Sequence, residues 1–250
     1  MLEFVDFSLK FKDKDNLVTV VKKLNFKIEK GERFALVGES GSGKSVTAMS
    51  VLRLLPEAIA EGKIYWNNFD LLSKDTDIRA IRGKKISMIF QEPMSALNPV
   101  YTVGEQISEA LNHLTELNAE EKNRKVLELL ELTGIDEPSR RAQCYPHELS
   151  GGQRQRILIS MALACEPDLL IADEPTTALD VTIRQQVMEL LYSIQKTKQM
   201  SILLITHDLP LVESFAERVG VMKNGEMIEC ERKKDLFVRP QHEYTRLLLN

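Results

Sequence analysis

The sequence predicts an α/β fold with a mainly parallel sheet, an antiparallel β subdomain at the N-terminus and a helical insert. Short runs that are apolar on both faces, as in strands covered by helices, recur at residues 34–37, 86–90, 169–172 and 202–205. The first run leads through a glycine-rich turn into a helical pattern, which is the order of a parallel α/β core. Residues 92–164 show helical periodicity with no convincing strand, which indicates the insert.

Composition restricts the classes of protein to which this chain can belong. Its 250 residues are 43% hydrophobic, enough to bury a core, and a net charge of −4 argues against broad binding to nucleic acid or anionic membranes. The apolar runs are far shorter than the roughly 20 residues of a membrane-spanning helix, so we expect no membrane insertion. The first residues do not resemble a secretory signal, and three scattered cysteines suggest reduced thiols, so an intracellular compartment is expected.

The remaining elements follow from local patterns. Alternating apolar positions in the first thirty residues predict an antiparallel hairpin with its turn at residues 12–16. Asn224-Gly225 predicts a second hairpin over residues 219–228, because this pair readily adopts positive φ angles. Helical spacing is found at residues 45–55 before Pro56, and at 103–117, 120–133 and 151–164. A charged amphipathic tail covers residues 231–250.

Residues 38–45 match the phosphate-binding pattern G-x-x-x-x-G-K-S between an expected strand and helix. The glycines let backbone N–H groups turn towards phosphate oxygens, and the helix adds the positive end of its dipole. Lys44 would bridge the β- and γ-phosphates, and Ser45 would bind Mg²⁺. The alternative is a simple glycine turn, but the pattern occurs by chance in only roughly 1% of chains this long, and the strand and helix context lowers that frequency further.

Four polar residues follow strand-like runs, where a parallel sheet presents its carboxyl edge to ligands. Asp173 would hold Mg²⁺ through water, and Glu174 would polarise the attacking water. Gln91 and His207 would lie at the same edge, with Gln91 positioning the water. The alternatives are a solvated acidic turn and a structural histidine, but four such residues together with the phosphate loop favour a shared site.

The segment Leu149, Ser150, Gly151, Gly152 and Gln153 precedes a helical pattern. Ser150 and Gln153 have the spacing of a capping box, which satisfies the first N–H groups of a helix. The two glycines at a helix start also form a possible second anion site, although the chain already has one phosphate loop. We therefore expect the segment to meet a γ-phosphate held by another subunit, and both interpretations can hold together.

These motifs resemble the nucleotide-binding subunit of ABC (ATP-binding cassette) transporters over essentially the whole chain. In family order they are the phosphate loop at residues 38–45, the Q-loop Gln91, the signature at 149–153, Asp173 with catalytic Glu174, the D-loop at 178–180 and the switch His207. The resemblance implies an adenine-stacking aromatic about 27 residues before the phosphate loop, where Phe11 is the best match. The phosphate-binding residues would be Gly38, Glu39, Ser40, Gly41, Ser42, Gly43, Lys44, Ser45 and Val46.

The resemblance also implies the fold and the other roles. It implies a P-loop NTPase (RecA-like) core at residues 1–91 and 165–230, a helical signature subdomain at 92–164, and a tail at 231–250. The cofactors would be ATP and Mg²⁺, with Ser45, Gln91 and Asp173 as metal ligands and Lys44 among the catalytic residues. Asp180 would link the two sites of a head-to-tail dimer, in which each signature meets the nucleotide of the partner.

Within this family, the chain resembles one branch in particular, the dipeptide, oligopeptide and nickel importers, including ATPases of microcin-type peptide uptake. The resemblance is carried by residues 88–99, 172–182 and 240–248. The tail departs from this branch, because His242-Glu243-Tyr244 replaces the usual His-Pro-Tyr and the usual longer extension is missing. We therefore expect either a short subunit or the first half of a tandem ATPase.

The resemblance implies an ATPase that powers uptake through a separate permease. Its partners would be an identical or different ATPase subunit, permease subunits and, indirectly, a solute-binding protein, at the cytoplasmic face of the inner membrane. The alternatives are an exporter-associated ABC ATPase and a soluble one acting on ribosomes or DNA. A simple kinase or GTPase would share the phosphate loop but would not need the signature.

Overall fold

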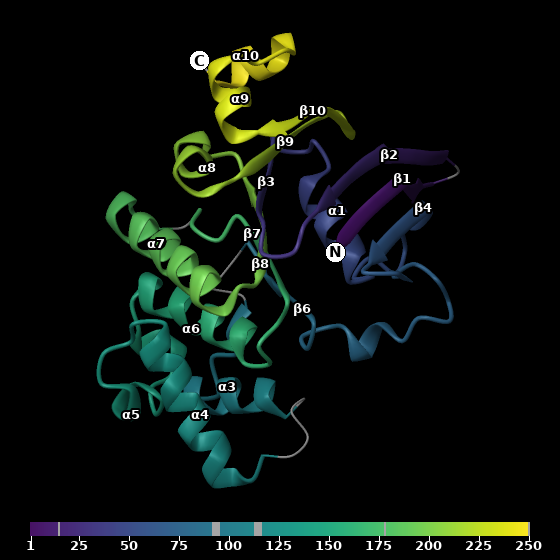
Figure 1. The fold of residues 1–250 in the computed structure, drawn as a ribbon. Helices are drawn as coiled ribbons and strands as arrows, with labels where there is room; N and C mark the ends of the chain where they lie inside the picture. Colours follow the sequence, from purple (N-terminus) through teal and green to yellow (C-terminus); the bar gives the residue numbers. More distant parts are fainter. Residues whose placement is uncertain (15, 92–95, 113–116, 178, 250) are drawn as a thin grey trace. The chain divides into compact units, whose positions relative to one another are not determined.

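The computed structural model describes residues 1–14, 16–91, 96–112, 117–177 and 179–249 (Figure 1). It divides into two compact units. The first contains Met1–Ile81 and Gln199–Asn250, and the second contains Arg82–Lys198. The domain boundaries expected from the sequence stay a prediction. No helix in the described ranges combines the length and the apolar character that a membrane span needs.

The first unit contains an antiparallel sheet in the order β2-β1-β4-β5. The predicted N-terminal hairpin is confirmed, because β1 pairs antiparallel with β2. Strands β4 and β5 were not predicted, since the first five residues of β4 are exposed and show no clear alternation. The strand bounds are β1 Leu2–Asp13, β2 Asn16–Ile28, β4 Ile59–Trp66 and β5 Phe69–Asp70.

The same unit contains the mainly parallel strands that carry the phosphate loop (Figure 1). Strand β3 (Arg33–Val37) pairs parallel with both β8 (Ser201–Thr206) and β9 (Arg218–Lys223). All six residues of β8 are buried, which explains its continuous apolar sequence. Aromatic rings join the two sheets, because Phe26 stacks on Phe4 at 4.5 Å and on Phe34 of β3 at 5.2 Å.

The first helix, α1 (Lys44–Val51), is shorter than expected. It was predicted to reach residue 55, but Arg53 has a φ of 50°, a left-handed conformation that ends the helix. The Arg53 guanidinium then donates hydrogen bonds to the carbonyls of Ser73 and Thr76. The unit's other helices are η1 Ile78–Ala80, α8 Leu209–Phe215, α9 Lys233–Val238 and α10 Glu243–Leu249.

The second unit contains two parallel strands and several helices. Strand β6 (Ile86–Ile89) lies parallel to β7 (Leu169–Asp173), both close to their predicted positions. The helix predicted over 103–117 ends earlier, at Leu111, and Asn118 caps the next helix; residues 113–116 lie outside the described part. The helices among its described residues are α3 Val103–Leu111, α4 Ala119–Leu132, α5 Pro138–Arg141, η2 Pro146–Glu148, α6 Gly151–Leu163 and α7 Val181–Lys198.

The predicted hairpin at Asn224-Gly225 is confirmed between β9 and β10 (Glu226–Arg232). Asn224 and Gly225 have φ angles of 50° and 83°. A Cβ atom on Gly225 would lie 2.2 Å from the carbonyl oxygen of Val20. This turn therefore needs glycine both for its backbone conformation and for the close approach of strand β2.

We expect Gly225→Ala to lower the free energy of unfolding by about 2 to 5 kcal/mol. The left-handed conformation costs a non-glycine residue about 1 to 2 kcal/mol, and overpacking adds about 1 to 3 kcal/mol. Gly31→Ala is the control, because Gly31 has a φ of 75° but a Cβ there would lie 3.8 Å from its nearest neighbour. Urea denaturation checks the difference, and equal losses in the two variants would contradict the steric argument.

Candidate functional site

The phosphate loop connects β3 to α1 in the first unit, as its sequence predicts. Gly38 has a φ of 148°, and a Cβ there would lie 2.2 Å from the Met222 carbonyl oxygen of β9. Gly43 caps the N-terminus of α1 with a φ of 101°. Side chains at these two positions would therefore block the path of the loop.

The side chain of Lys44 is folded into this loop and is only 5% exposed. Its ammonium donates hydrogen bonds to the carbonyl oxygens of Gly38 at 2.7 Å and Glu39 at 2.8 Å. It also lies 3.4 Å from the hydroxyl of Ser42. A buried cation next to backbone N–H groups at a helix start makes a strong binding site for phosphate.

In the second unit, the structure brings Gln91 and Glu174 together. The Gln91 amide donates to Oε2 of Glu174 at 3.2 Å, and Glu174 directly follows buried Asp173 at the end of β7. Glu174 has a φ of 45°, a conformation that costs energy in a non-glycine residue. Such strain concentrates at functional sites, where it fixes the direction of a side chain.

Thr177 is a residue of this cluster that the sequence reasoning missed. Its hydroxyl donates to the same Oε2 of Glu174 at 2.7 Å, the shorter of the two contacts. The Thr177 N–H also donates to the Glu174 carbonyl at 3.3 Å, which closes a turn after β7. A hydroxyl three residues after a strand-end carboxylate is the signal that could have found it.

The capping box predicted from Ser150 and Gln153 is confirmed at the start of α6. The Ser150 hydroxyl accepts from the Gln153 N–H at 3.3 Å, and the Gln153 side chain accepts from the Ser150 N–H at 3.0 Å. Gly152 is needed for packing, because a Cβ there would lie 2.7 Å from Ile183 of α7. Leu149 is buried and Gly151 is exposed, so the segment is partly anchored and partly open to solvent.

The D-loop residue Asp180 has a structural role at the start of α7. Its carboxylate accepts a hydrogen bond from the Ile183 N–H at 3.0 Å, which satisfies a free donor of the helix. Leu179 is buried beside it, and Ala178 lies outside the described residues. Asp180 itself is exposed, so it can also meet a partner.

His207 and Phe11 belong to the first unit. His207 is exposed and directly follows β8, the position expected from the sequence. Phe11 lies in β1 opposite Val18 and is half-buried, whereas Phe4, Phe7 and Phe26 are buried in the core. Phe11 is thus the least buried of these four aromatics, and its adenine contact stays a prediction.

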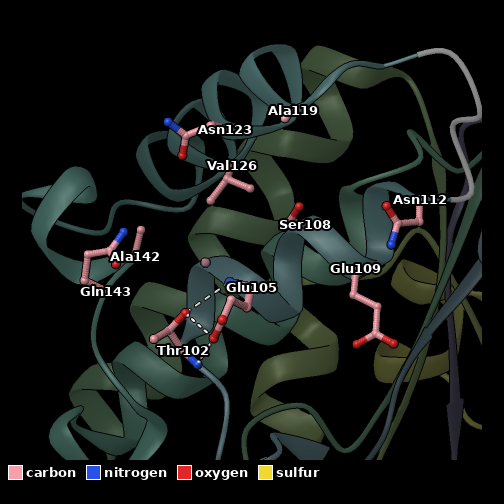
Figure 2. Close-up of a pocket in the computed structure, with 11 residues that line it drawn as sticks. Thr102, Glu105, Ser108, Glu109, Asn112, Ala119, Asn123, Val126, Ala142 and Gln143 are labelled. Carbon is pink, nitrogen blue, oxygen red and sulfur yellow. Dashed lines mark hydrogen bonds between the residues drawn. The ribbon is translucent and has the colours of Figure 1, made fainter.

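A separate pocket of about 380 Å³ lies in the second unit (Figure 2). Helices α3 and α4 contribute Glu105, Ser108, Glu109 and Asn123 to its lining. Hydrogen bonds from the N–H and hydroxyl of Thr102 hold the pKa of the Glu105 carboxyl below its usual value. The described lining contains two carboxylates and no basic side chain, so this pocket is unsuited to a nucleotide phosphate.

The sequence profile of the ABC transporter family matches residues 21–177. The chain therefore belongs to this family and is an ABC-type ATPase. It is 52% identical to the dipeptide transport ATP-binding protein DppD of Bacillus subtilis (strain 168), over 93% of this chain and 70% of that protein. It is 46% identical to the oligopeptide transport ATP-binding protein OppD of the same organism, over 98% of this chain and 70% of that protein.

Some relatives are much longer than this chain. It is 49% identical to the peptidoglycan transport ATP-binding protein YejF of Agrobacterium fabrum (strain C58 / ATCC 33970), over 100% of this chain but 46% of that protein. Among solved structures, the ATP-binding cassette MJ0796, a dimer in a post-hydrolysis state bound to ADP and Pi, superimposes with a TM-score of 0.83. That match has 30% sequence identity and covers 93% of this chain and 99% of the other.

We expect Thr177→Val to lower kcat about tenfold and to leave the KM for ATP unchanged. It removes the shorter hydrogen bond to the Glu174 carboxylate, and a bond to a charged group contributes about 1.5 to 3 kcal/mol. Thr197→Val is the matched control, since the Thr197 hydroxyl bonds only the Ser193 carbonyl within α7 among the described contacts. Steady-state phosphate release measures both variants, and equal kcat values would contradict a positioning role for Thr177.

Proposed function

We propose that this chain is the ATP-hydrolysing subunit of an ABC importer, energising uptake of peptides or a related small solute through a separate permease. The observation that carries the proposal is the preformed phosphate loop with its buried Lys44 ammonium. The named transport roles of the DppD and OppD relatives support the peptide class. Import also agrees with the tail and Gln91 regions, which resemble importer ATPases more than exporter ones.

The residues of the phosphate loop fit ATP. Gly38 and Gly43 give the loop its path to the start of α1, and Lys44 can exchange its carbonyl acceptors for the β- and γ-phosphates. Phe11 would stack on the adenine. The phosphate groups would be held by the residues of the loop, from Gly38 to Val46.

The roles of the polar strand-end residues follow from their chemistry. Mg²⁺ would supply charge neutralisation at the phosphates, held by Ser45, Gln91 and Asp173, whose oxygen atoms are the ligands this ion prefers. Glu174, fixed by Gln91 and Thr177, would accept the proton of the attacking water. His207 would lie beside the γ-phosphate. Together with Glu174, Gln91 and Lys44, it would form the set of catalytic residues.

Two ATPase subunits would form a head-to-tail dimer, either of identical or of different chains. Ser150 and Gly152 would contact the nucleotide of the partner, and Asp180 would link the two sites. A site divided between subunits couples phosphate charge to their separation, so ATP binding closes the dimer and hydrolysis reopens it. The dimeric state of the MJ0796 cassette supports a dimer of ATPase subunits.

The permease would dock near the segment after Gln91, at the cytoplasmic face of the inner membrane, where this chain is peripheral. Val100 and Tyr101 support this position, because they are 71% and 51% exposed although apolar or aromatic. Residues 92–95 of the same segment lie outside the described part. A solute-binding protein would act indirectly, through the permease.

We expect Glu174→Gln to retain ATP binding and to abolish turnover, because the amide keeps the shape of the side chain but accepts no proton. Glu189→Gln makes the same change at an exposed residue of α7, so it is the matched control and should hydrolyse ATP normally. ATP binding by calorimetry and steady-state phosphate release test the pair. Undiminished hydrolysis by Glu174→Gln would contradict the assignment of Glu174 as the general base.

We expect Ser150→Ala to lose most ATPase activity in the dimer, while Thr102→Ala retains it. Both residues form capping boxes, so each variant should lose about 1 kcal/mol of stability for the same reason. Only Ser150 would also contact the nucleotide of the partner. Thermal unfolding measured beside phosphate release separates the two effects, and parallel losses of activity would leave Ser150 with its capping role alone.

A further inference from the structure

The C-terminal tail reaches the phosphate loop within the first unit. The backbone N–H of Glu39 donates a hydrogen bond of 3.1 Å to the hydroxyl of Tyr244 in α10. The Tyr244 side chain is 4% exposed, and its ring lies 4.4 Å from the ammonium of Lys223 in β9. A residue 205 positions away therefore occupies a backbone donor of the loop.

The tail is fixed independently of this contact. The Glu229 carboxylate of β10 accepts the N–H groups of Gln241 and His242 at 2.8 and 3.1 Å. Burial alone would raise the pKa of Glu229, but these hydrogen bonds hold it below its usual value. Tyr244 also donates its own N–H to Nδ1 of His242 at 3.0 Å. The carboxylate thus anchors the start of α10 and sets the direction of the tyrosine.

The Tyr244 ring belongs to the apolar core beneath the loop. It packs in a buried cluster with Ala35 and Val37 of β3, the strand that leads into the loop. The departure from His-Pro-Tyr at Glu243 does not disturb this arrangement, because Glu243 is exposed. The ring and its hydroxyl are therefore rigidly placed relative to the loop.

Glu39 connects Tyr244 to the binding lysine. Its N–H is bound by Tyr244, and its carbonyl accepts the Lys44 ammonium at 2.8 Å. If the N–H were released, the peptides on either side of Glu39 could rotate and the carbonyls that hold Lys44 would move with them. The tyrosine hydroxyl restricts this motion before a ligand arrives, and such preorganisation lowers the cost of binding.

We propose that Tyr244 is a positioning residue for the phosphate loop, through which the C-terminal tail sets the affinity for ATP. This inference rests on the proposed function, because it assumes that the loop binds ATP. It assigns Tyr244 no contact with the nucleotide. The tail would act on ground-state and transition-state binding equally, which changes KM and leaves kcat unaltered.

Tyr244→Phe is the central test, because it removes the hydroxyl and keeps the buried ring. We expect it to weaken ATP binding and to raise KM about fivefold, as the loss of one hydrogen bond does, with kcat within about twofold of wild type. Amide hydrogen exchange should become faster at Glu39. Tyr192→Phe, which alters an exposed tyrosine of α7, should match wild type in all of these measurements.

Glu229→Ala provides a second route to the same effect. It releases the start of α10 without touching Tyr244 or the loop, so it should raise KM in the same direction. In the double variant with Tyr244→Phe, the two increases should be less than multiplicative, because both act through one contact.

The outcomes separate this inference from the proposed function. Wild-type ATP binding that is lost in Lys44→Ala, together with an unchanged KM and unchanged Glu39 exchange in Tyr244→Phe, would overturn the inference alone. A fall in kcat at constant KM would also overturn it, since that is the sign of a smaller folded fraction. Absence of Lys44-dependent ATP binding in the wild-type chain would overturn both.

Discussion

The buried ammonium of Lys44 is the constraint on which the first unit depends. A cation that is 5% exposed needs acceptors, and the loop supplies the carbonyls of Gly38 and Glu39. The loop keeps this shape because neighbouring elements hold it. The Gly225 N–H of the β9–β10 turn donates to the Ser42 carbonyl at 3.1 Å, and Tyr244 binds Glu39. The parallel strands, the hairpin and the tail thus all support one short segment.

In the second unit, backbone strain and helix caps fix the positions of the candidate site residues. Glu174 takes an unfavourable φ of 45°, and Gln91 and Thr177 both donate hydrogen bonds to its Oε2. Ser150 and Asp180 satisfy free N–H groups at the starts of α6 and α7. Under the proposed function, these caps also face a partner, so structural and functional demands fall on the same residues.

The sequence predicts the parts of this fold that depend on local chemistry. Strand β8 is apolar because it is buried, and Asn224-Gly225 turns the hairpin because both residues accept positive φ. Strand β4 was missed because its exposed residues lack alternation, and α1 ends early because Arg53 adopts a left-handed conformation that its residue type does not signal. The contact between Tyr244 and Glu39 joins residues too distant for any local pattern to reveal.

Under the proposed function, the loop at residues 38–45 is preformed for nucleotide phosphate, and only the Lys44 side chain moves when ATP binds. A crystal structure with Mg²⁺ and a non-hydrolysable ATP analogue tests it most directly. We expect the phosphates to lie on the backbone N–H groups of this loop, the Lys44 ammonium to move onto them, and the hydrogen bond from Glu39 to Tyr244 to be retained. A nucleotide bound elsewhere, or Lys44 still bound to the carbonyls of Gly38 and Glu39, would contradict it.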